Sequence, residues 1–226
     1  NRGDVFIIMG GSGCGKSTLL RHLLGLNQPA RGEILFRGED LWQKSPSARD
    51  LIMRRVGVLY QRGGLWSSMT LAENIALPLR EYTRYSRREI SELCELKLSL
   101  VGLAGFGNFY PAQISGGMQK RAGLARAIAL DPELLFFDEP SAGLDPVTAK
   151  RMDDLILQLQ ASLGATLVVV THELASIFAI GSNAVFLDSQ RRTMTAAGPP
   201  KTLLATCPDR VVLQFLTRDG SAPPPA

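Results

Sequence analysis

Residues 10–17 (GGSGCGKS) are of the types and at the spacing that bind a phosphate group. They match the pattern G-x-x-x-x-G-K-[ST], which forms a phosphate loop between a strand and a helix. Glycines let several backbone N–H groups converge on one anion, and the positive end of the following helix strengthens that site. Lys16 would bring a positive charge to the β- and γ-phosphates, and the Ser17 hydroxyl would ligate Mg²⁺. The segment predicts nucleotide contacts from Gly10, Gly11, Ser12, Gly13, Cys14, Gly15, Lys16, Ser17 and Thr18.

A second segment, residues 134–139 (LLFFDE), is an apolar strand that ends in two carboxylates. Asp138 at the strand end can reach the hydration shell of Mg²⁺ beside Ser17. Glu139 is then placed to orient the attacking water or to accept a proton from it. Two solvated acids in a loop are the alternative, and the phosphate loop upstream favours the catalytic interpretation.

Two single residues follow other predicted strands, and each could act at the nucleotide site or have an ordinary structural role. Gln61 comes directly after the strand at 56–60 and could contact the metal or the water. His172 follows the strand Thr166–Val170 and could hydrogen-bond the γ-phosphate, although a lone histidine after a strand is more often a structural capping or loop residue. The expected catalytic residues are Glu139, His172, Lys16 and Gln61, and the expected metal ligands are Ser17, Gln61 and Asp138.

A third segment, Ser115, Gly116 and Gly117, begins a predicted helix and offers a second phosphate-binding end. It combines a serine hydroxyl, two glycine N–H groups and a helix dipole. One site cannot easily use two such ends from the same chain, whereas two chains arranged head to tail can exchange them. The alternative is an ordinary capped helix with flexible glycines.

The elements that must position these residues alternate between strand and helix, which predicts an α/β fold with a mostly parallel sheet. Apolar runs predict strands at Val5–Met9, 56–60, 134–137, Thr166–Val170 and Asn183–Asp188. Helical patterns follow at 17–24, 71–103, 115–130, about 146–163 and Leu174–Ile180. A small antiparallel hairpin is expected at 33–40. We expect one domain, with a nucleotide-binding core at 1–66 and 131–217, a helical insertion at 67–130 and a flexible tail at 218–226.

Composition restricts the setting in which this site would work. The chain has 226 residues, a net charge of +4 and three cysteines without metal-like spacing. It contains no run of about 18 apolar residues and no export leader, so we expect a soluble cytoplasmic protein that reaches a membrane only through a partner. The small positive charge fits a nucleic-acid binder, an anionic membrane surface or a solvated face, and we favour the solvated face and expect no direct nucleic-acid partner.

Six segments in this order resemble the ABC ATPase family over nearly the whole chain. They are the Walker A loop at 10–18, the Q-loop at Gln61, the signature at 114–118, Walker B at 134–139, the D-loop at 141–145 and the switch histidine His172. The resemblance implies a phosphate-loop NTPase of the RecA-like fold with an inserted helical subdomain. It also implies that ATP with Mg²⁺ drives dimerisation and is hydrolysed to ADP and phosphate.

The chain departs from this family at two places. The signature usually reads Leu-Ser-Gly-Gly-Gln, whereas Ile114 and Met118 stand here. The aromatic residue on which the family stacks adenine lies upstream of the phosphate loop and is absent from this sequence.

Within the family, several stretches are most similar to the ATPases of Mla-type, MCE-associated phospholipid transporters. These are Val5–Met9, 74–81, 115–121, 125–129 and 208–216, while the D-loop is nearer the family at large. The likeness implies a homodimer bound to an integral membrane permease on the cytoplasmic face of the bacterial inner membrane. An MCE-domain substrate-binding protein and accessory subunits would complete the assembly.

Three other functions remain open at this stage. A small-polar-solute importer differs only in the permease, which this sequence does not contain. A soluble ABC protein acting on nucleic acid or the ribosome usually has two fused halves or a long coiled coil, and this chain has a single motif set and no heptad run. A degenerate binding module is disfavoured by the intact Lys16 and Glu139.

The segment after Gln61 is where we expect the permease to dock. Residues 63–71 place Trp66 and Met69 among small residues, with Leu77 and Pro78 close behind. The alternative is that these side chains fill the core of the insertion.

Overall fold

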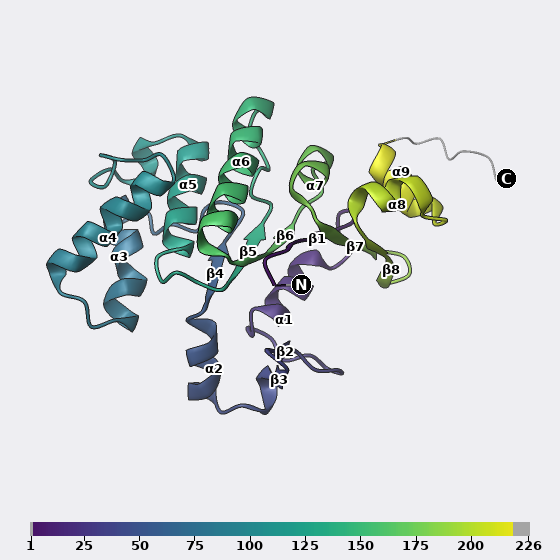
Figure 1. Ribbon diagram of the computed structural model, residues 1–226, viewed down its shortest axis with the longest axis horizontal. Coiled ribbons are helices and arrows are strands. Elements are labelled where there is room, and N and C mark those ends of the chain that lie inside the picture. The colour runs from purple at the N-terminus through teal and green to yellow at the C-terminus, as the bar shows by residue number, and fades with distance from the viewer. Residues whose placement is uncertain (1, 219–226) are drawn as a thin grey trace.

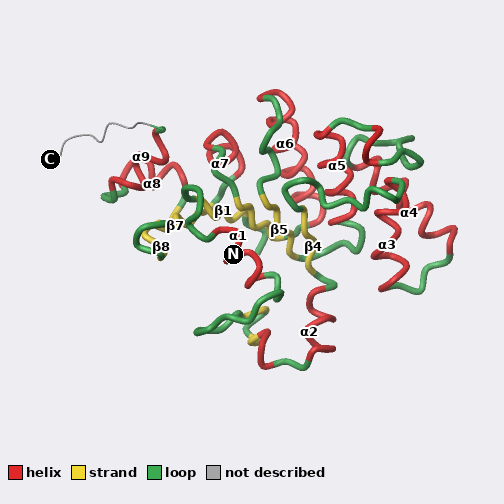
Figure 2. The backbone as a smooth tube through the Cα atoms, turned by 180° about the vertical axis from the view of Figure 1, so that it is seen from behind, coloured by secondary structure: helices red, strands yellow, loops and turns green. Residues whose placement is uncertain are grey.

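The computed structural model describes residues 2–218 and is built around a six-stranded sheet in the order β4-β5-β6-β1-β7-β8 (Figures 1 and 2). The first five strands in this order pair in parallel, and β8 pairs with β7 in the antiparallel sense. This is the predicted mostly parallel α/β fold. The strands are β1 (Val5–Met9), β4 (Val56–Leu59), β5 (Leu134–Asp138), β6 (Thr166–Val170), β7 (Asn183–Asp188) and β8 (Thr193–Gly198).

The central strands are apolar along their whole length because helices cover both faces of the sheet. On one face, Ile8 of β1 packs in a small cluster with Leu20 and Leu24, from helix α1 (Lys16–Leu23) and its end. On the other face, the alternate residue Ile7 belongs to the main core, which includes residues of α6 (Pro146–Leu163) and α7 (Leu174–Ile180). Both helices were predicted with these bounds.

Three further helices, α3 (Leu71–Tyr82), α4 (Arg87–Leu100) and α5 (Gly116–Ala127), pack together beyond β4 (Figure 2). The helical stretch predicted at 71–103 is therefore two helices. The break occurs because Ser86 caps α4, its hydroxyl accepting from the Glu89 N–H while the Glu89 carboxylate accepts from the Ser86 N–H. Thr70 and Glu73 form the same box at the start of α3.

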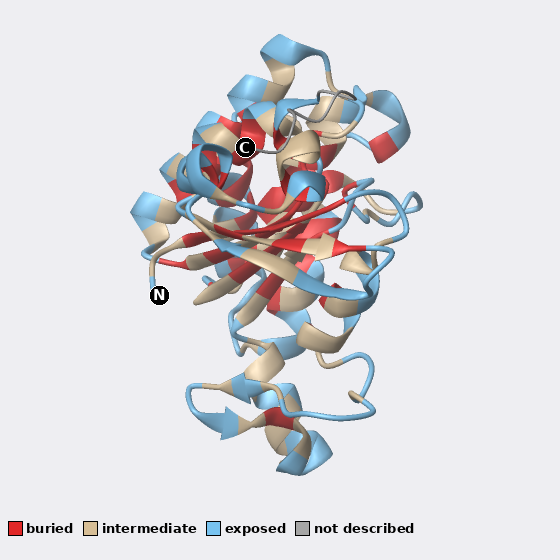
Figure 3. Cartoon of the chain, turned by 90° about the vertical axis from the view of Figure 1, so that its right-hand side faces the viewer, coloured by how far each residue is buried: buried red, intermediate tan, exposed pale blue. Residues whose placement is uncertain are grey.

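The predicted antiparallel hairpin is present as β2 (Leu35–Phe36) paired with β3 (Glu39–Asp40). It continues into the 3₁₀ turn η1 (Leu41–Gln43) and α2 (Pro46–Met53). Figure 3 shows that this part is largely exposed, whereas buried residues concentrate in the sheet and the helices on it. A second 3₁₀ turn, η2 (Pro111–Gln113), precedes α5.

Four elements were not predicted: α2, β8, α8 (Pro200–Thr206) and α9 (Arg210–Thr217). They are short, and β8 (TMTAAG) is an edge strand of weak hydrophobic pattern that is ordered by pairing with β7. Of the tail expected at 218–226, residues 219–226 lie outside the described part. Within residues 2–218, no helix is long and apolar enough to cross a membrane.

Candidate functional site

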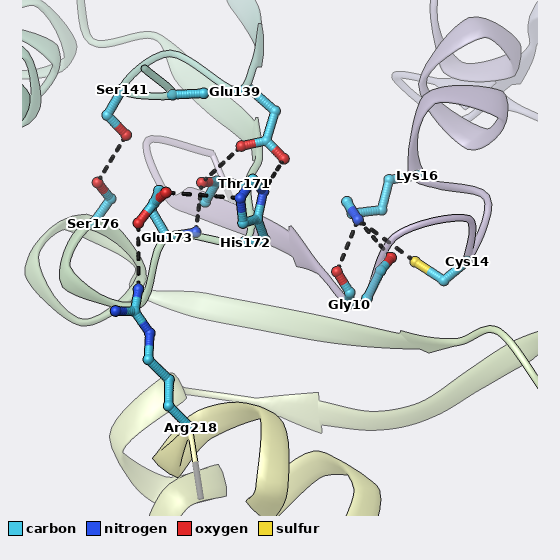
Figure 4. Close-up of polar contacts among 12 residues, drawn as sticks. Gly10, Cys14, Lys16, Glu139, Ser141, Thr171, His172, Glu173, Ser176 and Arg218 are labelled. Carbon is cyan, nitrogen blue, oxygen red and sulfur yellow. Dashed lines mark hydrogen bonds and ion pairs between the residues drawn. The ribbon is translucent and has the colours of Figure 1, made fainter. Parts of the chain in front are cut away.

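The carboxyl ends of three adjacent parallel strands bring the predicted site residues to one edge of the sheet. Asp138 of β5 pairs in register with Val170 of β6, and Val170 pairs with Ile8 of β1. The phosphate loop after β1, the acids that end β5 and His172 after β6 therefore lie close together (Figure 4). In open α/β sheets this edge is where ligands bind.

The phosphate loop connects β1 to α1 through backbone conformations that require glycine. Gly10 has a φ of +150°, and a Cβ there would meet the carbonyl oxygen of Leu187 at 2.4 Å. Gly15 is the N-terminal cap of α1 with a φ of +99°, and it brings no side chain to the first turn. No side chain of the capping residue therefore accepts a hydrogen bond from the N–H groups at the start of α1, and these groups are suited to bind an anion.

Lys16 is the first residue of α1, and its side chain folds back over the loop. Its Nζ donates to the carbonyl oxygens of Gly10 at 2.8 Å and Gly11 at 2.9 Å, and it lies 3.8 Å from Sγ of Cys14. The lysine is thereby held over the loop, where a phosphate would bind. Ser17 and Thr18 are exposed at the same helix start.

Asp138 has the electrostatic surroundings of a cation ligand. Burial raises the pKa of its carboxyl, as does the neighbouring Glu139, while Lys16 and Arg21 act in the opposite direction. A divalent cation would relieve the repulsion between the two adjacent carboxylates. Within residues 2–218 no group of three or more His, Cys, Asp or Glu side chains could hold a metal. The Asp138 carboxylate and the Ser17 hydroxyl are oxygen donors and fit Mg²⁺, which takes few protein ligands and completes its shell with water and phosphate oxygens.

Glu139 is buried, and its N–H and both carboxylate oxygens have hydrogen-bonding partners. It has a positive φ of +51°, and its N–H donates to the carbonyl of Val170 at 2.8 Å. Its Oε1 lies 2.6 Å from Nδ1 of His172, and Thr171 Oγ1 donates to Oε2 at 3.4 Å. A residue with a side chain at positive φ is strained, and such strain gathers at functional sites.

The contact between Glu139 and His172 was not predicted from the sequence, which assigned the two residues separate roles. His172 is about half exposed, and its Nε2 also lies 3.7 Å from Oε1 of Glu173. A histidine bonded to the expected base can orient that carboxylate. Contact of His172 with a γ-phosphate stays a prediction.

A buried chain of hydrogen bonds holds the segment that follows Glu139. Ser141 Oγ lies 3.1 Å from Ser176 Oγ, and Ser176 donates to Oδ2 of Asp153 at 2.8 Å. Burial raises the pKa of Asp153, whose Oδ1 has no hydrogen-bond partner among the described residues. Only the tertiary fold brings Ser176 and Asp153 to this loop.

Gln61 is exposed two residues beyond β4, the strand next to β5. The structure places it at the correct edge of the sheet, and its contact with metal or water stays a prediction. The segment after it is fixed to α5, because Arg126 donates to the carbonyl of Gly64 at 2.7 Å. A Cβ on Gly123 of α5 would meet the Gly63 carbonyl oxygen at 2.5 Å, so these backbones are in close contact.

Ser115 caps α5 and is exposed. Its Oγ accepts from the Met118 N–H at 3.3 Å, and no hydrogen bond joins it to the phosphate loop within residues 2–218. Ser115 and Gly117 line a cleft of about 550 Å³ together with Thr148 and Arg151 of α6. Figures 1 and 2 both place α5 with α3 and α4, apart from α1. The fold therefore leaves this second phosphate-binding end facing outward.

Comparisons with known proteins agree with this geometry. The ABC transporter family model matches residues 1–142. The chain is 41% identical to the intermembrane phospholipid transport system ATP-binding protein MlaF of Escherichia coli, over 99% of this chain and 82% of that relative. It is 43% identical to the probable ribonucleotide transport ATP-binding protein mkl of Mycobacterium leprae, and spans 61% of the length of that relative.

Solved structures give the same result. The fold matches the ATP-binding cassette MJ0796, solved as a dimer in a post-hydrolysis state bound to ADP and Pi, with a TM-score of 0.80 and 30% identity over 88% of this chain and 86% of that one. It also matches cbiO1 of Clostridium perfringens, part of an ABC transporter complex, with a TM-score of 0.82 and 26% identity over 91% of this chain and 80% of that one. The chain belongs to the ABC transporter family, which confirms the resemblance carried by its six motifs.

Proposed function

We propose that this chain is the ATP-hydrolysing subunit of an ABC transporter that moves phospholipid across or between membranes. The observation that carries the ATPase activity is the meeting, at one sheet edge, of the phosphate loop with Asp138 and Glu139. The cargo rests on the 41% identity, over nearly the whole chain, to a relative named for intermembrane phospholipid transport.

In this mechanism, the loop N–H groups and Lys16 bind the β- and γ-phosphates of ATP. Lys16 exchanges its bonds to the Gly10 and Gly11 carbonyls for phosphate oxygens. Ser17, Gln61 and Asp138 would hold Mg²⁺, which neutralises charge on the phosphates when bound. Glu139, oriented by His172 and Thr171, accepts a proton from the attacking water.

The outward-facing Ser115 end completes the site of a second copy. Two chains arranged head to tail each offer their Ser115, Gly116 and Gly117 to the γ-phosphate held by the other. The relative MJ0796 forms a dimer in its solved structure. Loss of the γ-phosphate after hydrolysis removes the group that both chains bind, so the dimer separates.

The permease contact lies around the end of β4 and the start of α3. Trp66 is 58% exposed, so it does not fill the core of the insertion. Its loop is rigid, because the buried Asn74 accepts from the Trp66 N–H at 2.7 Å and donates to the Trp66 and Met69 carbonyls. A cleft of about 590 Å³ beside it is lined by Tyr60, Leu77, Pro78 and Tyr82, among others. The lining differs from the expected one, since Trp66 and Met69 stand outside it.

The remaining components of the proposed assembly are those that the resemblance to Mla-type ATPases implies. The chain works at the cytoplasmic face of a bacterial inner membrane, held there by its permease, with an MCE-domain protein as the substrate-binding partner. No nucleic acid takes part.

The test of the ATPase assignment is hydrolysis by the purified chain with Mg·ATP. Glu139→Gln should keep ATP binding, accumulate the ATP-bound dimer and lower turnover by about 10³-fold. Glu133→Gln is the matched control, because Glu133 precedes the same strand at its opposite end and its carboxylate pairs with Arg37 and Arg55. Near-normal hydrolysis by Glu139→Gln would reject the assignment.

The cargo is tested separately, with the chain and its permease reconstituted in vesicles. ATP-dependent transfer of labelled phospholipid supports the proposal. The 43% identity to a relative named for ribonucleotide transport makes uptake of labelled ribonucleotide the outcome that would favour a polar-solute importer. Trp66→Ala should weaken co-purification with the permease and leave ATP binding intact, whereas Leu96→Ala, on the exposed part of α4, should change neither.

A further inference from the structure

Lys120 of α5 is a buried cation whose hydrogen bonds all go to one short loop. The residue is 7% exposed. Its Nζ donates to the carbonyl oxygens of Glu139 at 3.2 Å, Pro140 at 3.0 Å and Ala142 at 2.5 Å. An ammonium group has three N–H donors, so all of its donors are used. Burying a charge is costly unless the charged group is fully hydrogen-bonded. The complete set of partners around Lys120 therefore indicates a specific arrangement.

The loop that Lys120 binds is the one that carries the expected catalytic base. Glu139 has a φ of +51°, and the chain forms no regular element between the end of β5 at Asp138 and the start of α6 at Pro146. Such a backbone persists only when its surroundings hold it. Among the described residues, the Glu139 carbonyl accepts one further bond, a turn bond from the Ala142 N–H that is also 3.2 Å long. Lys120 is the one described side chain that binds the carbonyls of both Glu139 and Pro140.

Fixing the backbone at Glu139 fixes the direction of its Cα–Cβ bond, and therefore the region that its carboxylate can reach. The carboxylate is thereby directed at His172 and Thr171. Within residues 2–218 Lys120 makes no hydrogen bond or ion pair with the carboxylate itself. Its charge acts on that carboxylate at longer range, and its direct contact with Glu139 is through the backbone carbonyl.

We propose that Lys120 is a positioning residue, which holds the strained backbone at Glu139 so that its carboxylate meets the attacking water. The inference rests on the proposed ATPase function. It gives α5 two roles, since the helix offers Ser115 to the partner's nucleotide and holds Glu139 for its own. Occupation of one site can thereby alter the geometry of the other through a single rigid helix.

The test compares Lys120→Met with the unmodified chain. Methionine keeps an unbranched side chain as far as the Cε position and removes all three bonds. The value of kcat should therefore fall by about 10²-fold, as expected for a catalytic group displaced by about 1 Å, while ATP affinity is unchanged. Lys120→Gln, which keeps two N–H donors, should recover part of kcat. Lys97→Met is the control for lost stability, because Lys97 is an equally buried lysine that pairs with Asp131 at 2.5 Å, outside the site.

A double variant separates positioning from a general structural role. In the Glu139→Gln background, Lys120→Met should cause no further loss of the residual turnover, because the group it positions is already gone. A full additional loss in that background, or a kcat loss equal to that of Lys97→Met, would overturn the inference. If Lys120→Met does not fold, Lys120→Gln carries the same comparison. Failure of the unmodified chain to hydrolyse ATP would instead reject the ATPase function itself.

Discussion

The helices α1 and α5 both begin at a glycine- and serine-containing segment, yet their N-termini are built in opposite ways. Gly15 begins α1 at positive φ with no side-chain cap, and the preceding loop curls over the helix end. Ser115 begins α5 in an extended conformation, and its hydroxyl caps the Met118 N–H. The first end is shaped to receive a phosphate within its own chain, whereas the second is already capped and faces outward.

This difference explains how one chain could carry two helix N-termini of this kind that do not compete for the same phosphate. The α1 end needs an anion to satisfy its N–H groups, and Lys16 is stored beside it on loop carbonyls. The α5 end is stable without a ligand, and its serine O–H is still free to donate while its oxygen accepts. We therefore expect a monomer to bind nucleotide at α1, and the role proposed for the α5 end is to contact a phosphate that a partner presents.

The largest loss of ATP turnover is expected from Lys16→Ala. Removal of the charge that would meet the β- and γ-phosphates should lower turnover by about 10³-fold and weaken nucleotide binding by the monomer. Lys201→Ala, an exposed lysine on α8, should leave both unchanged. Normal ATP binding by Lys16→Ala would show that the α1 end does not work as described.

A somewhat smaller loss is expected from Ser115→Asp. Aspartate caps helices as well as serine does, so the fold should be kept, while its negative charge repels the partner's γ-phosphate. Turnover should fall by about 10²-fold, and binding of ATP to the monomer should persist. Ser86→Asp makes the same change at the cap of α4, which has no predicted ligand, and should leave turnover intact. Equal activity of the two variants would contradict a role for Ser115 across the dimer.

A moderate effect is expected on the rate of thiol labelling in the phosphate loop. Cys14 lies in the loop, with Sγ 3.8 Å from Nζ of Lys16, and should react more slowly when Mg·ATP is bound. Cys207 supplies an accessible reference that nucleotide should not protect. Burial raises the pKa of Cys94 to about 11, so its thiol stays protonated at pH 8 and should react only after unfolding. Equal labelling of Cys14 with and without Mg·ATP would count against its place in the nucleotide site.

The smallest effect concerns the cap of α5 itself. Ser115→Ala removes the acceptor for the Met118 N–H and should cost about 1 kcal/mol, which lowers Tm by about 2–4 °C in a domain of this size. Thr70→Ala should cost more, because Thr70 and Glu73 cap α3 reciprocally. Thermal unfolding in the absence of nucleotide measures both. An unchanged Tm for Ser115→Ala would mean that the serine does not cap α5 in the free chain.

The sequence by itself determined the elements whose signals are local. The phosphate loop, the acids after β5 and the strands that precede them are contiguous patterns, and a buried parallel strand leaves an apolar run that needs no partner to be recognised. The start of α6 was predicted at about the correct residue, because a proline is favoured in the first turn of a helix. The structure adds that the Asp145 carboxylate caps this helix. The start of α5 was visible in the same way, since a serine before two glycines is a local signal for a capped helix. Phosphate binding at this helix start stays a prediction.

Only the tertiary structure decided which distant groups meet these segments. His172 contacts Glu139 across 33 positions, and Lys120 reaches the Glu139 carbonyl across 19. A lysine on a polar helix is normally predicted to be exposed to solvent. Lys120 is buried because the carbonyls of a distant loop accept its hydrogen bonds, and the periodicity of the helix sequence does not predict those partners. The exposure of Trp66 was likewise undecided, because an aromatic beside small residues suits a core and a docking surface equally. Motifs record what a segment can bind, whereas the fold decides which other segments hold it in place.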